Sequence, residues 1–222
     1  MKVFIVYAHP SEDSLTRHVR DAFIAGLESA GHSYLVSDLY KMNFKTDMTE
    51  EEYRREAFYR GDIPVPDDVQ AEQDKINSSG AIVFIFPLFW SDAPAKMVGW
   101  FDRVWTYGFA YGDASVAGAD NVAARAAVSS VAPSGVALNS AGRTMKQLEK
   151  GLVLCVAGNT MEYFHETGIL GALEKVMLQD RLFDRVKSKE LVIFDSASRE
   201  LESRKTRWED YLKRAFKIGA EI

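Results

Sequence analysis

Between residues 82 and 104 the chain reads Ile82-Val83-Phe84-Ile85-Phe86-Pro87-Leu88-Phe89-Trp90-Ser91-Asp92-Ala93-Pro94-Ala95-Lys96-Met97-Val98-Gly99-Trp100-Phe101-Asp102-Arg103-Val104. It predicts a buried strand, a short aromatic loop and a helix. Residues 81–86 are continuously apolar and β-branched or aromatic, which is typical of a strand covered on both faces of a parallel sheet. Pro87 ends this strand.

The loop that follows the strand predicts a ligand site. Open sheets of parallel strands bind ligands at the carboxyl ends of the strands. Phe89 and Trp90 are aromatic, and Pro87 and Pro94 bound the loop. These features indicate a flat, polarisable ligand, for which a flavin ring is the obvious candidate.

Four more runs have the character of strands, and helical patterns separate them. Strands are expected at residues 3–7, 33–37, 152–157 and 191–194. Helices are expected at residues 15–29, 67–77, 95–105, about 168–179 and 200–218. The alternation predicts an α/β fold, a doubly wound parallel sheet of five strands with helices on both faces.

Composition limits the class of protein. The chain has 222 residues, 47% of them apolar, so it can bury a large core, and we expect one domain over residues 1–222. Net charge is −5 with scattered charges, which argues against nucleic-acid partners and membrane insertion. Four histidines and one cysteine show no spacing typical of a metal site. Cys155 lies in an apolar run, which favours a buried core thiol over a nucleophile.

The apolar run at residues 3–7 is too short for a signal peptide, and no run of about 18 apolar residues is present. We therefore expect a cytoplasmic protein. Two connections, residues 38–66 and 107–150, are long enough to be functional or to carry extra structure. The second contains an expected insertion at about residues 113–149, whose role cannot be read from its composition.

The turn after the first strand, Ala8-His9-Pro10-Ser11-Glu12-Asp13-Ser14-Leu15-Thr16, leads into a helix and is rich in hydroxyl groups. Free amides at a helix start can hold a phosphate, and Ser and Thr hydroxyls add donors. Ordinary capping by Ser14 or Ser11 is an equally good interpretation of the turn alone. Dinucleotide-binding and P-loop glycine motifs are both missing.

Several motifs taken together resemble one family, the NAD(P)H:quinone oxidoreductases of the DT-diaphorase type. They include residues 8–16, Ser37-Asp38-Leu39-Tyr40-Lys41-Met42-Asn43-Phe44, Ala71-Glu72-Gln73, residues 86–90, residues 99–104 and Gly108-Phe109-Ala110-Tyr111. They occur in register over about the first half of the chain. The resemblance implies a flavodoxin-like five-stranded sheet, a bound flavin (FAD, with FMN as the alternative) and a homodimer with the active site at the subunit interface. It also implies two-electron reduction of a small quinone-like acceptor by NADH or NADPH, with ping-pong kinetics.

The resemblance also implies site residues. Its flavin phosphate and ribityl positions fall on His9, Ser14, Leu15 and Thr16, and its flavin-ring loop falls on Pro87, Leu88, Phe89, Trp90 and Ser91. Tyr111 matches an aromatic residue of the substrate pocket, contributed across the dimer.

The second half departs from the family pattern. The family's Thr-Thr-Gly-Gly turn has its best counterpart in Val156-Ala157-Gly158-Asn159, so we expect Ala157, Gly158 and Asn159 to offer backbone contacts to the flavin. The family's active-site tyrosine falls at Tyr163, or at Phe164 after a slip of one residue. Its histidine falls at Leu170, which leaves two alternatives: His165 replaces it from another turn, or the chain uses no histidine there.

Other interpretations stay open at this point. Phe89 and Trp90 could be core or interface aromatics, and the Trp100-Phe101 pair is expected to pack its helix on the sheet. The altered glycine turn and missing histidine would suit a flavin-binding regulatory subunit of another protein. A flavodoxin-like electron carrier and a dedicated biosynthetic reductase are further alternatives.

Overall fold

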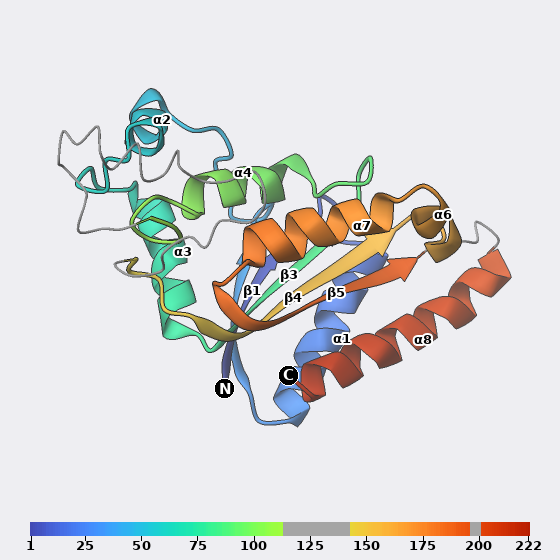
Figure 1. Ribbon diagram of the computed structural model, residues 1–222. Coiled ribbons are helices and arrows are strands. Elements are labelled where there is room, and N and C mark those ends of the chain that lie inside the picture. The colour runs from blue at the N-terminus through green and yellow to red at the C-terminus, as the bar shows by residue number, and fades with distance from the viewer. Residues whose placement is uncertain (113–142, 196–200) are drawn as a thin grey trace.

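A computed structural model describes residues 1–112, 143–195 and 201–222, with side chains from residue 207 in the last range (Figure 1). Most of the expected insertion at 113–149 lies outside these ranges. The elements in chain order are β1 (Lys2–Tyr7), α1 (Leu15–Ser29), β2 (Ser33–Asp38), α2 (Glu50–Ala57), α3 (Asp67–Ser78), β3 (Ala81–Pro87), α4 (Ala95–Val104), β4 (Leu148–Ala157), α6 (Met161–Glu166), α7 (Ile169–Glu174), the π-helical segment η2 (Lys175–Leu182), β5 (Val186–Asp195) and α8 (Leu201–Ala220).

The five strands form one parallel sheet in the order β2-β1-β3-β4-β5. The expected α/β class, strand number and parallel pairing are therefore confirmed. All seven residues of β3, including the terminal Pro87, are buried. The order reverses between β1 and β3, because β2 lies on one side of β1 and the later strands lie on the other.

Along the strands, successive side chains enter two hydrophobic cores, one on each face of the sheet. On one face, Phe4 and Phe84 pack with Trp100 of α4 and with α3, α7 and η2. On the other, Ile5 and Val83 pack with α1 and α8. Figure 1 shows α4 and α7 above the sheet and α1 and α8 below it, so helices cover both faces.

Two glycines allow α1 and α8 to approach backbone to backbone. A Cβ on Gly26 would lie 2.0 Å from the Phe216 carbonyl oxygen, and one on Gly219 would lie 2.1 Å from that of Phe23. Both distances are far below van der Waals contact. Any larger residue at either position therefore forces these helices apart.

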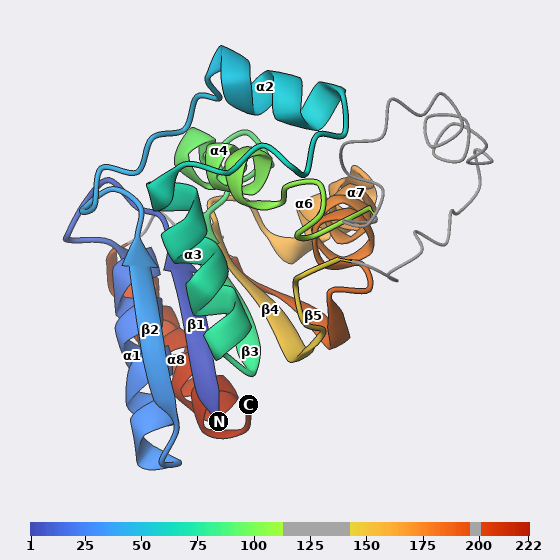
Figure 2. The same ribbon diagram turned by 90° about the vertical axis from the view of Figure 1, so that its left-hand side faces the viewer.

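The connection of residues 38–66 carries α2, which lies outside α4 in Figure 2. Arg103 of α4 holds α2 in place, because its Nε donates to Glu52 Oε1 at 2.7 Å. The two Nη atoms of Arg103 donate to the carboxylate of Asp68 at the start of α3, at 2.6 and 3.0 Å. The hydrogen bond from Arg103 lowers the pKa of Asp68. Gly99 lets the backbone of Thr46 lie directly on α4.

Several boundaries differ from the sequence expectations. β4 and β5 begin at Leu148 and Val186, before the expected residues 152 and 191, because their polar amino ends pair across the sheet, as Lys187 does with Glu149 at 2.7 Å. The helix expected at about 168–179 is α7 continued by η2 to Leu182, and the short α6 precedes it.

Candidate active site

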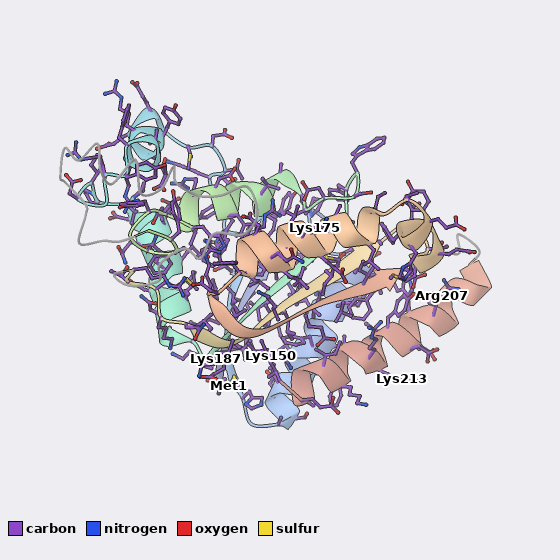
Figure 3. The ribbon with its side chains drawn as sticks, viewed as in Figure 1. Met1, Lys150, Lys175, Lys187, Arg207 and Lys213 are labelled. Atoms are coloured by element: carbon purple, nitrogen blue, oxygen red, sulfur yellow. The ribbon has the colours of Figure 1, made fainter. Side chains whose placement is uncertain are left out.

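Three loops meet at the carboxyl edge of the sheet. They follow β1, β3 and β4, which are consecutive neighbours. The amide of Ala8 donates to Ile85 O at 3.1 Å, and the amide of Leu88 donates to Val156 O at 2.8 Å, so the loops leave the edge side by side. The first two flank the point where strand order reverses, which is where open sheets of this kind bind ligands. Lys150 of β4 and Lys187 of β5 lie toward the opposite, amino-terminal edge of the sheet (Figure 3).

The first loop presents free amides at the start of α1. Ser14 is the N-cap, and its Oγ accepts from the amide of Arg17 at 3.2 Å, which confirms one of the two expected caps. The amides of Leu15 and Thr16 make no hydrogen bond to the described part of the chain. Two such donors at the positive end of a 15-residue helix suit a phosphate group.

His9 shapes this turn and is half-buried in it. Its Nδ1 lies 2.9 Å from the amide nitrogen of Ser11 and 3.0 Å from the carbonyl oxygen of the same residue, so this ring atom is held by the turn and Nε2 makes neither contact. The acidic residues do not oppose an anion here. Glu12 pairs with Arg17 and Asp13 lies near His18, and both carboxylates are largely exposed.

The second loop ends in a tight turn with Trp90 at its tip. Phe89 and Asp92 exchange two backbone hydrogen bonds, of 2.9 and 3.1 Å, and the central residues Trp90 and Ser91 have φ of 53° and 62°. Positive φ at both central residues is the geometry of a type I′ turn, and at two non-glycine residues it is strained, as is common near functional sites. Phe89 is 45% exposed and Trp90 is fully exposed, so neither belongs to the core of this chain.

The third loop, which follows β4, has an exposed main chain at Gly158 and Asn159. A Cβ on Gly158 would meet nothing within 4 Å. Ala157 is buried as the last residue of β4. The space above Gly158 would accept a ring system lying against the peptide planes.

Three of the remaining candidates, Tyr163, Phe164 and His165, lie on the short helix α6 and differ in exposure and direction. Tyr163 is 41% exposed whereas Phe164 is buried in the core, so of the two aromatics only Tyr163 can reach a ligand. His165 is exposed but lies two residues from Tyr163, and residues two apart do not share a helix face. Leu170 packs against the core below α7.

Tyr111 lines a cavity of about 580 Å³ between α4 and η2. Its hydroxyl donates to Glu56 Oε2 at 2.7 Å. Burial, together with the charge of Glu56, raises the pKa of Tyr111 well above its ordinary value and keeps it a phenol. Phe101, Trp105 and Arg181 line the same cavity. Neither Glu56 nor Arg181 belongs to a motif, so nothing in the sequence alone points to them.

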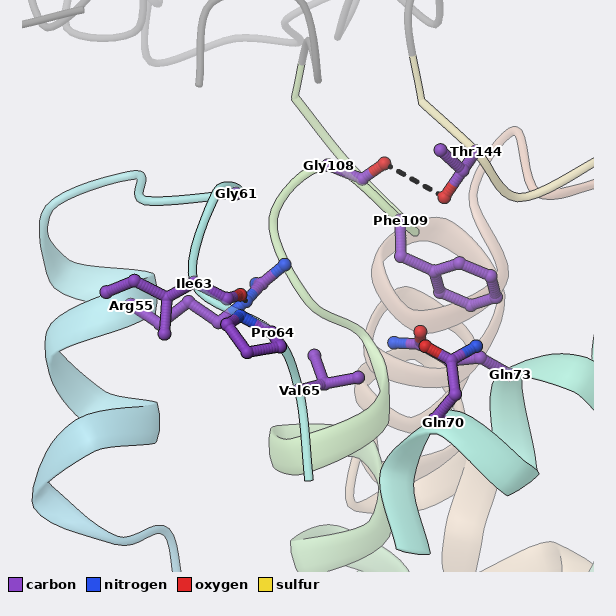
Figure 4. A pocket seen from close by; sticks show the side chains of 10 residues that line it. All are labelled: Arg55, Gly61, Ile63, Pro64, Val65, Gln70, Gln73, Gly108, Phe109 and Thr144. Carbon is purple, nitrogen blue, oxygen red and sulfur yellow. Dashed lines mark hydrogen bonds between the residues drawn. The ribbon is translucent and has the colours of Figure 1, made fainter. Parts of the chain in front are cut away.

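A second cavity, of about 190 Å³, lies between α3 and the loop after α2 (Figure 4). Arg55 at its wall is fully engaged: Nε donates to Ile63 O, Nη1 to Glu56 and Nη2 to Tyr107 O, at 2.6 to 2.9 Å. This arginine therefore braces the loop instead of offering a binding group.

Other groups have structural roles. Trp100 and Phe101 pack α4 on the sheet as expected, and Trp100 Nε1 donates to the buried Glu72 at 2.8 Å. Cys155 is buried in the core, and burial raises the pKa of its thiol. Within the described ranges, no cluster of three or more His, Cys, Asp or Glu side chains could hold a metal ion. Over the same residues, no helix is long and apolar enough to cross a membrane.

A model of the flavodoxin-like fold family matches residues 1–179, and the chain belongs to this family. Its relatives are NAD(P)H and quinone oxidoreductases. The structure of NAD(P)H:quinone oxidoreductase from Methanothermobacter marburgensis is 39% identical, with a TM-score of 0.82 over 100% of this chain and 96% of that one. NAD(P)H dehydrogenase (quinone) 1 of Rattus norvegicus is 35% identical over 124 residues, 50% of this chain and 45% of that protein.

A ribosyldihydronicotinamide dehydrogenase-like protein of Penicillium crustosum is 36% identical over 126 residues, 50% of this chain and 46% of that protein. The chain spans about half the length of the curated relatives it matches. The likeness to the Methanothermobacter structure, in contrast, extends over the whole chain.

Proposed function

We propose that this protein is a flavin-dependent NAD(P)H oxidoreductase that reduces quinone-type acceptors by two-electron hydride transfer. The observation that carries the proposal is the convergence of three loops at the reversal of strand order. They present free helix amides, exposed aromatics and open glycine backbone. The likeness over the full chain to an NAD(P)H:quinone oxidoreductase supports the same conclusion.

The residues present fit a flavin. The amides of Leu15 and Thr16, with the ring of His9, would hold the phosphate, and Ser14 keeps the helix end in place. Phe89 and Trp90 would border the ring on one side, and Gly158 would let the ring lie close to backbone. When bound, the flavin supplies the hydride chemistry, which leaves binding and orientation to the protein.

The chain's own groups would then have three roles. The backbone of Ala157, Gly158 and Asn159 would hold the polar edge of the ring with fixed amide dipoles, which stabilise negative charge better than mobile water does. Tyr163 would contact the reacting face, and His165 is the weaker candidate because α6 turns it away. Tyr111 would contribute to an acceptor pocket at the interface of a homodimer, and it lines a cavity of its own chain beside Glu56.

Releasing the bound cofactor and following NADH and NADPH oxidation with benzoquinone tests this function. Released FAD or FMN, with fast quinone-dependent turnover and parallel initial-rate lines, is the expected result. FAD is the proposed flavin and a cytoplasmic location the proposed setting. A protein that takes up no flavin on reconstitution would contradict the proposal and favour the regulatory-subunit alternative.

A further inference from the structure

The cavity between α4 and η2 combines aromatic walls with two guanidinium groups. Phe101, Trp105 and Tyr111 supply the walls, and Arg181 and Arg185 supply the charge. Its volume of about 580 Å³ lies within the range typical of small-molecule sites, about 300 to 1,000 Å³. A planar aromatic molecule would fit such surroundings.

Neither guanidinium has a close carboxylate partner in the part of the chain that is described. Arg181 lies over the Phe101 ring at 4.6 Å, its Nη1 donates to Met177 Sδ at 3.3 Å, and Asp92 Oδ1 is 3.8 Å away. Among the described residues, Arg185 donates only to backbone carbonyls, from Nε to Ala110 O and from Nη1 to residues 180 and 181. Burial lowers the pKa of both side chains.

The carboxylates of the cavity do not neutralise this charge at close range. Glu56 already accepts from Arg55, from the Tyr107 amide and from Tyr111. Asp102 and Asp180 are exposed residues of the lining, and neither forms an ion pair with Arg181 or Arg185. Arg181 and Arg185 are therefore charged groups of the lining without a carboxylate at close range among the described residues, whereas Glu56 has its counter-charge in Arg55.

The unbonded nitrogens of Arg181 are open to a ligand. Nε and Nη2 of Arg181 make no hydrogen bond to the described residues. Among those residues, Arg17 Nε is the only fully buried side-chain nitrogen or oxygen without a hydrogen bond, so the two free nitrogens of Arg181 are accessible to solvent. An anion placed there would form charge-assisted hydrogen bonds and offset the cost of burying the guanidinium.

We infer that this cavity binds the aromatic acceptor through an anionic substituent, carboxylate or sulfonate, which Arg181 recognises. The inference rests on the proposed function and names the acceptor class. Arg181 also lies beside Asp92 of the turn that carries Trp90, so the cavity adjoins the loop assigned to the flavin ring. Arg181 is thus a specificity-determining residue, and neutral quinones are the poorer substrates.

A matched pair of acceptors tests this specificity: 1,2-naphthoquinone and its 4-sulfonate, with the holoprotein. Arg181→Gln is expected to lower kcat/KM for the sulfonate by about 10- to 100-fold, the effect of one charge-assisted hydrogen bond, and to leave the neutral quinone within about 3-fold. Lys213→Gln on α8 removes the same charge from an exposed site across the sheet and should change neither value. Arg181→Lys should restore part of the preference.

Equal losses for both acceptors, or an effect confined to the KM for NADPH, would overturn the inference. Binding of redox-inert naphthalene-2-sulfonate, measured by calorimetry, separates it from the proposed function. Binding that weakens at least about 10-fold in Arg181→Gln supports the site even if no acceptor is reduced. Failure to bind the sulfonate in a protein that turns over neutral quinone would reject the site and leave the proposed function standing.

Discussion

Arg103 and Glu52, far apart in the sequence, form a nearly buried ion pair in which Nε lies 2.7 Å from Oε1. The pair joins α4 of the core to α2 of the long connection. Glu56 lies one turn further along α2, where it meets Tyr111. The ion pair therefore fixes the wall of the cavity as well as the connection.

Replacing Arg103 tests this clamp. Arg103→Met leaves the carboxylate of Glu52, 8% exposed, without its partner, and should lower the free energy of unfolding by about 3 to 5 kcal/mol. Arg54→Met breaks an exposed pair with Glu50 and should cost less than about 1 kcal/mol. Urea unfolding measures both. Equal, small losses would show that the clamp is not needed for stability.

The glycine contact between α1 and α8 predicts a second stability difference. Gly26→Ala would place a methyl group against the Phe216 carbonyl and should destabilise the protein by about 1 to 3 kcal/mol. Gly171→Ala on α7 meets open space and should stabilise by about 0.4 to 1 kcal/mol, because alanine loses less backbone entropy. Thermal unfolding compares the two, and a neutral Gly26→Ala would rule out the close approach.

Ser14 allows phosphate binding to be separated from helix capping. Asp and Asn both cap helices as well as Ser does, so Ser14→Asp and Ser14→Asn should unfold within about 0.5 kcal/mol of wild type. Only Asp adds negative charge beside the free amides of Leu15 and Thr16. Flavin affinity, measured by fluorescence quenching during reconstitution, should fall at least about 10-fold in Ser14→Asp alone. Identical affinities would place the phosphate elsewhere.

Tyr211 makes the free energy of unfolding depend on pH in the alkaline range. Its hydroxyl donates to Asp195, and burial raises its pKa to about 12, with that hydrogen bond as the second cause. An unfolded tyrosine ionises near pH 10. The raised pKa therefore contributes stability that is complete below about pH 10 and is lost as the pH rises toward 12.

Urea unfolding from pH 8 to pH 11 measures this effect. The difference between wild type and Tyr211→Phe should shrink as the pH rises, because phenylalanine has no proton to lose. Tyr53→Phe, which removes an exposed hydroxyl, is the control for stability at pH 8. Curves for wild type and Tyr211→Phe that stay parallel would contradict the assignment.

The sheet was predictable because its buried strands are continuous apolar runs. β3 is an example, and the α1 pattern gave that helix its exact bounds. The amino ends of β4 and β5 escaped prediction because Glu149 and Lys187 are polar residues that pair only once the strands meet. The six-residue α6 is too short to show helical periodicity.

Some residues of the candidate site could be predicted from the sequence, and others could not. The loops that contain His9 and Trp90 could be predicted because each follows a strand whose apolar run marks where the strand ends. Glu56, Arg181 and the Arg103 clamp depend on contacts between residues far apart in the chain. Local patterns carry no information on such contacts, since topology alone brings these side chains together.

The most direct test of the central claim is an anaerobic double-mixing experiment on the flavin-loaded protein. NADH or NADPH is mixed first, absorbance near 450 nm is followed, and benzoquinone is then added. We expect loss of the flavin absorbance on the first mixing and its full return on the second, at rates that match steady-state turnover. Absorbance that does not respond to either nucleotide, in protein that holds flavin, would contradict the central claim.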